Sequence, residues 1–233
     1  MSLHLDWVNA KTARKACERW HYARKLPPMK GVYLGAWEDG IFTGIIAYTN
    51  SASIMLPKGF GLAYRQVVEL ARIALSSHRF QVSRLIAISS KMVRKKMPGL
   101  RLIVSFADTR QKHHGGVYQA AGWIYTGEGG AKTEYVIGGR VIHCRDYSAA
   151  KYGAAAFGRQ IPRSRFEHAQ IIKAPPKHRY LLPLDDGMRD LVSTMAKPYP
   201  KRARSIAVDA SANHAEEGGS SPTRALHLTD EST

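Results

Sequence analysis

The stretches VVELARIAL (residues 67–75), SRLIAISSKMVRKKM (residues 83–97) and RLIVSFA (residues 101–107) decide the fold class. The first and the third are short apolar runs, which are typical of buried strands. In the second, apolar residues recur at helical spacing through Leu85, Ile86 and Val93. A strand, a helix and a second strand in succession favour two parallel strands in one sheet. The sequence therefore predicts an α/β fold.

The segments on either side of this unit predict a mixed central sheet flanked by helices. Asn9 is placed to cap a helix over residues 10–24, which Pro27 and Pro28 would end. Asp39 and Gly40 separate two apolar runs and favour a β-hairpin, because both tolerate positive φ angles. Further along we expect a short helix at residues 116–123, a turn through Gly127, Gly129 and Gly130, strands at residues 132–138 and 140–145, a helix at residues 148–160 and an extended segment at residues 177–184.

The composition changes along the chain and suggests three regions. Residues 1–145 carry the α/β pattern and are expected to form the catalytic domain, and residues 146–200 are expected to form a C-terminal extension packed on it. From Lys201 the chain is small, polar and rich in Gly and Ser, so residues 201–233 are expected to be a disordered tail.

The charge of the chain points to a polyanionic partner. The 233 residues include 35 Lys and Arg but only 18 Asp and Glu, for a net charge of +17. Residues 1–200 hold 31 basic and 13 acidic residues, so the excess lies outside the tail. Double-stranded DNA is the expected partner. No apolar run is long enough for a membrane span or a signal peptide, so we expect a cytoplasmic protein without a membrane partner. The sequence does not indicate an oligomeric state.

Several cations near the amino terminus are candidate contacts to DNA phosphates. The helix at residues 10–24 carries apolar residues on one face and cations largely elsewhere. The DNA-contact candidates are Arg14, Lys15, Arg19, Arg24 and Lys25, with further cations at Lys91, Arg94, Lys95, Lys96, Arg159, Arg163, Arg165 and Lys177. Each could equally be solvated surface. Trp20, Trp123 and Tyr125 could stack on an exposed base, although burial is the commoner fate of Trp.

The segment GGVYQAAGWIYTG (residues 115–127) resembles the signature helix of the N-acetyltransferases. In that family the matching tyrosine, here Tyr118, often acts as general acid. The alternative is an ordinary amphipathic helix. Asp108 follows a predicted strand, at the edge of an α/β sheet where ligands commonly bind.

Residues 78–83 stand where acetyltransferases hold the pyrophosphate of coenzyme A. Gln81 and Ser83 replace the glycines of that loop. Ser83 is therefore either an anion-binding residue or a helix N-cap. The donor is accordingly open between acetyl-CoA and another small molecule.

Arg72 places a charge inside an apolar strand, which is costly unless the charge is paired. Strand alternation would send Arg72 and Glu69 to opposite faces of the sheet. We therefore expect Arg72 to find a partner such as Asp108 or a bound anion.

Five motifs in one order resemble the Mom family of DNA-modification proteins from Mu-like bacteriophages. They are W-H-Y-x-R-x-x-P from Trp20, E-L-x-R-I from Glu69, a serine at the next helix start, S-F-A-D-T from Ser105 and G-x-x-Y-Q-A-A-G-W from Gly115. K-H-R-Y-x-x-P-L from Lys177 and K-P-Y-P-K-R from Lys197 extend the similarity over most of the chain.

The resemblance implies an acetyltransferase-like fold and a specific reaction. It implies conversion of adenine N6 in double-stranded DNA to the carbamoylmethyl derivative, which protects phage DNA from host restriction. It also implies iron as a cofactor. Carried over by motif, the expected metal ligands are His21, Tyr22 and Asp108, the expected catalytic residues are Asp108, Tyr118 and Tyr22, and the expected donor-binding residues are Arg72 and Ser83. Tyr48, His113 and His114 are chemically as able to bind a metal, although a solvated loop is the simpler account of the two histidines.

The sequence also leaves two other function classes open. One is a coenzyme A dependent N-acetyltransferase that acts on a protein or a small amine, which Tyr118 favours and the missing glycines oppose. The other is a DNA-binding protein without catalysis, for which the charge alone suffices but which does not explain the ordered motifs.

The charge predicts a steep salt dependence of DNA binding. Each phosphate that Lys or Arg neutralises releases condensed counterions, so six to ten contacts would cost roughly a thousand-fold or more in affinity between about 50 and 200 mM salt. Fluorescence anisotropy with a labelled duplex measures this directly. An affinity that stays flat over that range would contradict a DNA partner.

Overall fold

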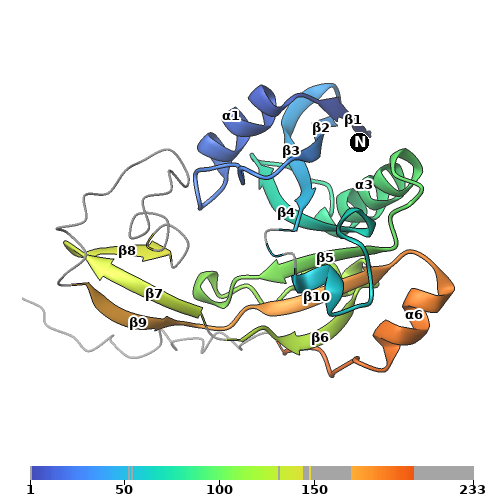
Figure 1. The fold of residues 1–233 in the computed structure, drawn as a ribbon. Helices are drawn as coiled ribbons and strands as arrows, with labels where there is room; N and C mark the ends of the chain where they lie inside the picture. Colours follow the sequence, from blue (N-terminus) through green and yellow to red (C-terminus); the bar gives the residue numbers. More distant parts are fainter. Residues whose placement is uncertain are drawn as a thin grey trace, which may run out of the picture. The chain divides into compact units, whose positions relative to one another are not determined.

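Among the residues that the structure describes, seven strands form one mixed sheet and three more form a smaller one (Figure 1). The computed structural model describes residues 2–51, 53, 55–130, 132–143, 147 and 169–201. The large sheet has the order β1-β2-β3-β4-β5-β10-β6, and the small sheet has the order β8-β7-β9. The strands are β1 (Leu3–Val8), β2 (Gly31–Glu38), β3 (Ile41–Asn50), β4 (Val67–Leu75), β5 (Leu102–Ala107), β6 (Ile124–Glu128), β7 (Lys132–Ile137), β8 (Arg140–His143), β9 (Gln170–Ala174) and β10 (His178–Pro183).

The helices flank the large sheet. They are α1 (Ala10–Trp20), α2 (Met55–Lys58), α3 (Val82–Lys96), α4 (Gly116–Ala120) and α6 (Asp186–Ser193), with single 3-10 turns η1 (Tyr64–Gln66) and η2 (Thr109–Gln111). Within the described residues, no helix is long and apolar enough to cross a membrane. The predicted α/β class, with a mixed sheet flanked by helices, is confirmed.

The predicted strand–helix–strand unit is present as β4, α3 and β5. β4 and β5 pair in parallel, and the other neighbouring strands of the large sheet pair antiparallel. The hairpin between β2 and β3 turns at Asp39 and Gly40, whose φ angles are 50° and 82°. Both angles lie in the left-handed region that Asp-Gly turns use.

Three local expectations differ from the structure, and a fourth is confirmed. α1 ends at Trp20, and His21 is its C-cap, so the helix is shorter than residues 10–24. Gly127 lies inside strand β6 and not in a turn. Ser83 is not a helix N-cap, because α3 is capped by Gln81 without a side-chain hydrogen bond. The extended segment from Lys177 supplies β10, which is the strand between β5 and β6 in the large sheet.

Some expectations fall outside the described residues. These are the helix at residues 148–160, the tail from residue 202, Cys144 and the cations Arg159, Arg163 and Arg165. Cys17 is described and lies fully buried against β3, and burial raises the pKa of its thiol to about 11. This is the inert, buried thiol that the sequence predicts.

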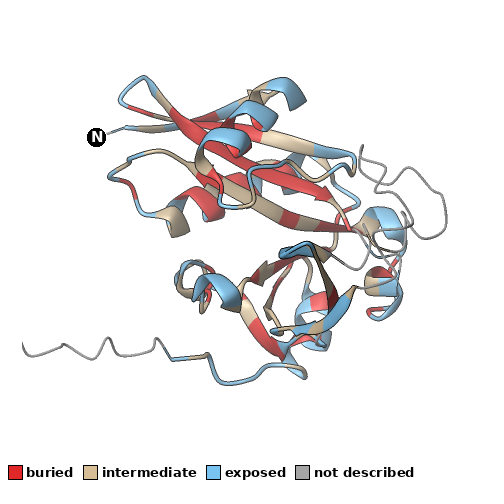
Figure 2. Ribbon diagram, turned by 90° about the vertical axis from the view of Figure 1, so that its left-hand side faces the viewer, coloured by how far each residue is buried: buried red, intermediate tan, exposed pale blue. Residues whose placement is uncertain are grey.

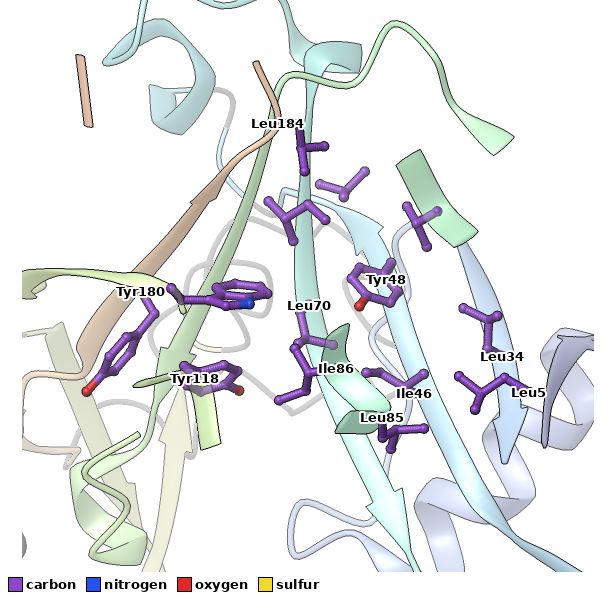
Figure 3. Packing of buried hydrophobic residues seen from close by; sticks show 14 of the residues in the cluster. Leu5, Leu34, Ile46, Tyr48, Leu70, Leu85, Ile86, Tyr118, Tyr180 and Leu184 are labelled. Atoms are coloured by element: carbon purple, nitrogen blue, oxygen red, sulfur yellow. The ribbon is translucent and has the colours of Figure 1, made fainter. Parts of the chain in front are cut away.

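The hydrophobic core lies on both faces of the large sheet. On one face α3 packs Leu85 and Ile86 against β2, β3 and β4, together with the aromatic rings of α4 and β10 (Figure 3). On the other face α1 packs on β3, and α6 packs Met188 and Val192 on β5 and β10. Figure 2 shows the buried residues following the strands, with exposed residues on the outer sides of the helices.

A β-bulge in β4 changes which side chains share a face. Opposite β3, Leu70 pairs with Tyr48 and Arg72 pairs with Ala47, so Ala71 is the extra residue. Leu70 and Ile73 pack in the α3-side core, whereas Ala74 packs with α1. Arg72 therefore shares the α1-side face with Glu69. The prediction that alternation separates Glu69 and Arg72 is wrong, because the bulge resets the alternation between them.

The parallel ladder between β4 and β5 is short. It covers three residue pairs, from Val67 with Leu102 to Glu69 with Val104, although both strands continue beyond it. At the next step the Ser105 hydroxyl donates to the Leu70 carbonyl at 2.8 Å. Where the two strands diverge, the Ser105 side chain thus supplies the hydrogen bond that a backbone N–H would supply in a continued ladder.

A substitution at Gly115 tests how tightly the aromatic core around Tyr180 is packed. A Cβ there would collide with the ring of the fully buried Tyr180, and its φ angle of 81° already disfavours other residues. We expect Gly115→Ala to destabilise the protein by about 2–4 kcal/mol, from overpacking plus strain. Gly122→Ala is the matched control, because Gly122 has a φ angle of 76° but open space around it. It should cost only about 1 kcal/mol. Equal losses in urea denaturation would contradict the packing.

Candidate active site

A cavity of about 1100 Å³ opens on the α1-side face of the large sheet, near the divergence of β4 and β5. Its wall combines α1, the loop of residues 25–30, the ends of β3 and β5, the middle of β4 and the small sheet. Among its described lining residues seven are cationic and three are acidic. The cations are Arg14, Lys25, Lys30, Arg72, Arg110, Lys132 and Lys177, and the acids are Glu69, Asp108 and Glu134. The cavity therefore suits an anionic ligand.

Asp108 joins three separate segments of the cavity wall. Lys177 Nζ donates to Asp108 Oδ2 at 2.7 Å, and the Tyr22 hydroxyl donates to the same oxygen at 3.3 Å. The other oxygen, Oδ1, accepts the backbone N–H of Arg110 at 3.1 Å. The carboxylate follows β5, the phenol follows α1 and the ammonium precedes β10, so the fold assembles this group from distant parts of the sequence.

The protonation states of this group follow from its surroundings. Burial alone would raise the pKa of Asp108, but the hydrogen bond and the charge of Lys177 hold that pKa below its usual value. Burial and the Asp108 charge raise the pKa of Tyr22. At neutral pH the cavity wall therefore presents an ionised carboxylate, a neutral phenol and an ammonium group.

His21 lies next to Tyr22 but is buried as the C-cap of α1. Burial, followed by the charge of Arg72, lowers the pKa of His21 to about 4. Its Nδ1 accepts the Ala23 N–H at 3.0 Å, so the neutral ring carries its proton on Nε2. Neither ring nitrogen keeps a free lone pair for a metal in this arrangement.

The expected iron ligands are each engaged by another group of the protein in this structure. His21 Nδ1 is occupied, Tyr22 is a neutral phenol and Asp108 is already paired with an ammonium. Within the part of the chain that the structure describes, no group of three or more His, Cys, Asp or Glu residues could hold a metal ion. Iron at these residues is not supported, and we derive no chemical step from it.

The other histidines and Tyr48 do not complete such a site either. His113 is exposed in the loop before α4, where its ring and that of Tyr22 are nearly perpendicular with centroids 6.0 Å apart. The carbonyl of His114 accepts the Tyr180 hydroxyl. Tyr48 is fully buried on the opposite face, where its hydroxyl bonds Ser89 and Ser90.

Arg72 reaches the cavity through the bulge. Its Nε donates to the Lys25 carbonyl at 3.2 Å, and its NH1 donates to the Ala71 carbonyl at 2.6 Å. These acceptors are backbone oxygens and carry no full charge, so the positive charge of Arg72 is not cancelled by them. The guanidinium also holds the loop at Lys25 against β4.

Tyr118 and Ser83 lie apart from this group. The Tyr118 hydroxyl is 2.8 Å from Ser105 Oγ, and its ring packs on Trp123 and Tyr180 (Figure 3). Because Ser105 gives its single proton to the Leu70 carbonyl, the Tyr118 hydroxyl must donate to Ser105. Burial raises the pKa of Tyr118 to about 12. Neither Tyr118 nor Ser83 lines the cavity.

The amino-terminal cations differ in their surroundings. Arg14 and Lys25 line the cavity, and Lys15 is exposed on α1. The Arg19 guanidinium lies 5.5 Å from the centroid of the Trp20 ring. Arg24 NH1 donates to the carbonyls of Glu18 and Arg19, so Arg24 also closes the end of α1.

Sequence reasoning missed the roles of Lys177, Arg110 and Glu134. The sequence predicts Lys177 only as a contact to DNA, whereas in the structure it is the ion-pair partner of Asp108. Arg110 NH2 lies 2.6 Å from Glu134 Oε2, which ties η2 to the small sheet beside the cavity. The available signal for Lys177 was its position at the start of a family-like motif.

Fold and cavity together define an α/β protein with a mixed sheet and a cationic ligand site. The chain belongs to the Mom protein family, whose model matches residues 2–201. It is 24% identical over 209 residues to the methylcarbamoylase mom of Escherichia phage Mu, which covers 85% of this chain and 84% of that protein. The family resemblance predicted from the ordered motifs is confirmed.

Solved structures with a similar fold include acetyltransferases. A putative acetyltransferase from Salmonella typhimurium, solved with its cofactor acetyl-CoA, has a TM-score of 0.45 at 11% identity and covers 80% of this chain and 96% of that chain. A putative phosphinothricin N-acetyltransferase has a TM-score of 0.44 at 11% identity and covers 79% of this chain and all of that chain.

Lys177→Met tests the ion pair at the centre of the cavity wall. Removing the ammonium leaves a half-buried carboxylate, so the pKa of Asp108 should rise. In the parent, stability from the depressed Asp108 pKa is present at neutral pH and is lost as pH falls below the ordinary value. In the variant this acid-dependent loss should become smaller, because the pKa of Asp108 moves back toward its ordinary value. NMR titration of labelled Asp carboxyls measures the pKa, with Lys132→Met as a cavity control. An unchanged Asp108 titration in Lys177→Met would contradict the pairing.

Proposed function

We propose that this protein converts adenine in double-stranded DNA to N6-carbamoylmethyladenine and thereby protects phage DNA from restriction. The observation that carries the proposal is the cationic cavity around Asp108, Tyr22 and Lys177 in a chain of the Mom family. The relative from phage Mu is named a methylcarbamoylase, which agrees with this reaction.

The size and the charge of the cavity support a nucleotide substrate. Ligand cavities are commonly about 300–1,000 Å³, so the volume of about 1100 Å³ suits a nucleotide and a second small molecule. Adenine N6 is hydrogen-bonded inside a duplex, so an enzyme that modifies it most simply takes the nucleotide out of the stack. Arg14, Lys25 and Lys30 at the α1 side can then offset the charge of flanking phosphates.

The reaction needs a group that accepts a proton from N6, and a weak base is sufficient for this. One N6–H bond breaks and one N6–C bond forms, while the donor loses its leaving group. The N6 lone pair is delocalised into the ring, so N6 becomes strongly acidic once the new bond forms. An ionised carboxylate of low pKa such as Asp108 can therefore take that proton. Tyr22 is placed to orient the base or the donor by a hydrogen bond.

The opposite part of the cavity suits the donor. Arg72 lies on the β4 wall, where it donates to two backbone carbonyls, and Arg110, Lys132 and Lys177 line the small-sheet side. Such a surface would hold an anionic donor that carries a carbamoylmethyl group on a leaving group, so that the new N6–C bond replaces the bond between the CH2 and the leaving group. Ser83 lies outside this surface, so we assign the donor to the cavity and not to the start of α3.

Mass spectrometry of nucleosides from cells that make the protein tests the reaction. We expect deoxyadenosine heavier by one carbamoylmethyl group, and DNA that resists restriction enzymes cutting at adenine-containing sites. An acetyl adduct, or unmodified DNA together with an acetylated protein lysine, would favour the coenzyme A dependent acetyltransferase. DNA that is bound but never modified would favour a protein without catalysis.

Paired variants test the residues in the same assay. Asp108→Asn and Tyr22→Phe are near-isosteric and should lower the modification rate by about 100-fold or more. Tyr118→Phe removes a hydroxyl that lies outside the cavity lining, so it should cost stability but leave the rate within a few-fold of the parent. The reverse ranking would return the catalytic role to Tyr118.

A further inference from the structure

Thr49 carries a polar atom without a partner at the cavity. It is the second-last residue of β3, is 1% exposed and lines the cavity. Its Oγ1 is buried and makes no hydrogen bond to any described residue. Buried hydroxyls are almost always bonded, so each exception calls for an explanation. A bound molecule in the cavity is one explanation, because such a molecule would meet Thr49.

Glu69 lies directly opposite Thr49 on the neighbouring strand. The two are register partners between β3 and β4, and both line the cavity. Tyr48 points into the α3-side core, so alternation directs Thr49 to the α1-side face that the cavity occupies. A hydroxyl and a carboxylate thus stand side by side on its sheet wall.

We propose that Thr49 and Glu69 form a base-reading pair that recognises adenine in this cavity. The inference rests on the proposed function and names how its substrate base is selected. The Thr49 hydroxyl donates to a ring nitrogen of the base, and the Glu69 carboxylate accepts from its N6 amino group. Both groups belong to the rigid sheet, so their spacing is fixed before the base enters.

The chemistry of the pair matches adenine and opposes guanine. Adenine presents an amino donor beside a ring-nitrogen acceptor on both its Watson–Crick and its Hoogsteen edge. A carboxylate beside a hydroxyl donor complements that pattern. Guanine has the O6 acceptor in place of the amino group. Its O6 would face the Glu69 carboxylate with no proton between the two oxygens, so the contact would be repulsive. Cytosine shares the amino and acceptor pattern, but its single ring reaches less far into the cavity.

The pair makes a prediction that a purely structural threonine does not. Thr49→Val replaces the hydroxyl by a methyl group of similar shape, so it removes an unsatisfied polar group and should leave the melting temperature equal or higher. Thr43 is the matched control. It is also buried, but its Oγ1 donates to the Ala36 carbonyl at 3.0 Å. Thr43→Val should therefore lower the melting temperature and leave base recognition unchanged.

Binding of the full-length protein to modified duplexes tests the recognition without any need for turnover. Each duplex carries one purine opposite an abasic site: adenine, 1-deazaadenine, 7-deazaadenine, unsubstituted purine or guanine. The parent should lose about ten-fold in affinity for one of the two deaza analogues and for purine, and more for guanine. The Thr49→Val variant should bind the adenine duplex no more tightly than the duplex with the deaza analogue that the parent disfavours. It should still bind the adenine duplex more tightly than the purine duplex. In Glu69→Gln the preference over purine should shrink.

The outcomes separate this inference from the proposed function. Equal affinity of the parent for all five duplexes, with steep salt dependence, overturns the base-reading pair and leaves DNA binding standing. Absence of binding to any duplex overturns both. A Thr49→Val variant that keeps full discrimination, or that loses stability as Thr43→Val does, shows that the hydroxyl serves the fold and also overturns the proposal.

Discussion

The early end of the parallel ladder between β4 and β5 is the constraint on which the rest of the structure depends. After Glu69 and Val104 the two strands no longer pair, and the Ser105 hydroxyl takes over one backbone acceptor. The bulge at Ala71 follows at once and directs Arg72 to the same face as Glu69. Divergence and bulge together convert the middle of an apolar sheet into a charged cavity wall. Because both features sit in the backbone, the polar side chains are held in place before any ligand arrives.

The cavity is completed by contacts between segments that are far apart in the chain. Lys177 and Tyr22 meet on Asp108, and Arg110 meets Glu134 on the small sheet. Each pairing places a charge where burial alone would disfavour it, and the partner compensates for that cost.

The sequence predicts the parts of the fold that depend on local pattern. The apolar runs give β4 and β5, the helical period gives α3, and Asp39 with Gly40 gives the hairpin, because each depends on residues close together in the chain. The ordered motifs also predict the family, and they name Tyr22 and Asp108 as residues of one site. The two side chains are hydrogen-bonded in the structure. The bulge at Ala71 carries no local signal, so the orientation of Arg72 was predicted wrongly. The insertion of β10 between β5 and β6 depends on pairing across the whole sheet, which is why Lys177 could not be assigned to Asp108 beforehand. Tyr118 matches a family helix, but only the packing shows that its hydroxyl turns inward to Ser105.

In the proposed reaction this cavity receives an adenine that has left the DNA stack. Fluorescence of 2-aminopurine, which retains the purine rings and is quenched by stacking, tests it most directly when the base replaces one adenine in a duplex. Addition of the protein should raise the emission strongly at saturation, and Asp108→Asn should preserve the rise because it leaves the cavity in place. Saturating binding with unchanged emission at every adenine position would contradict the account.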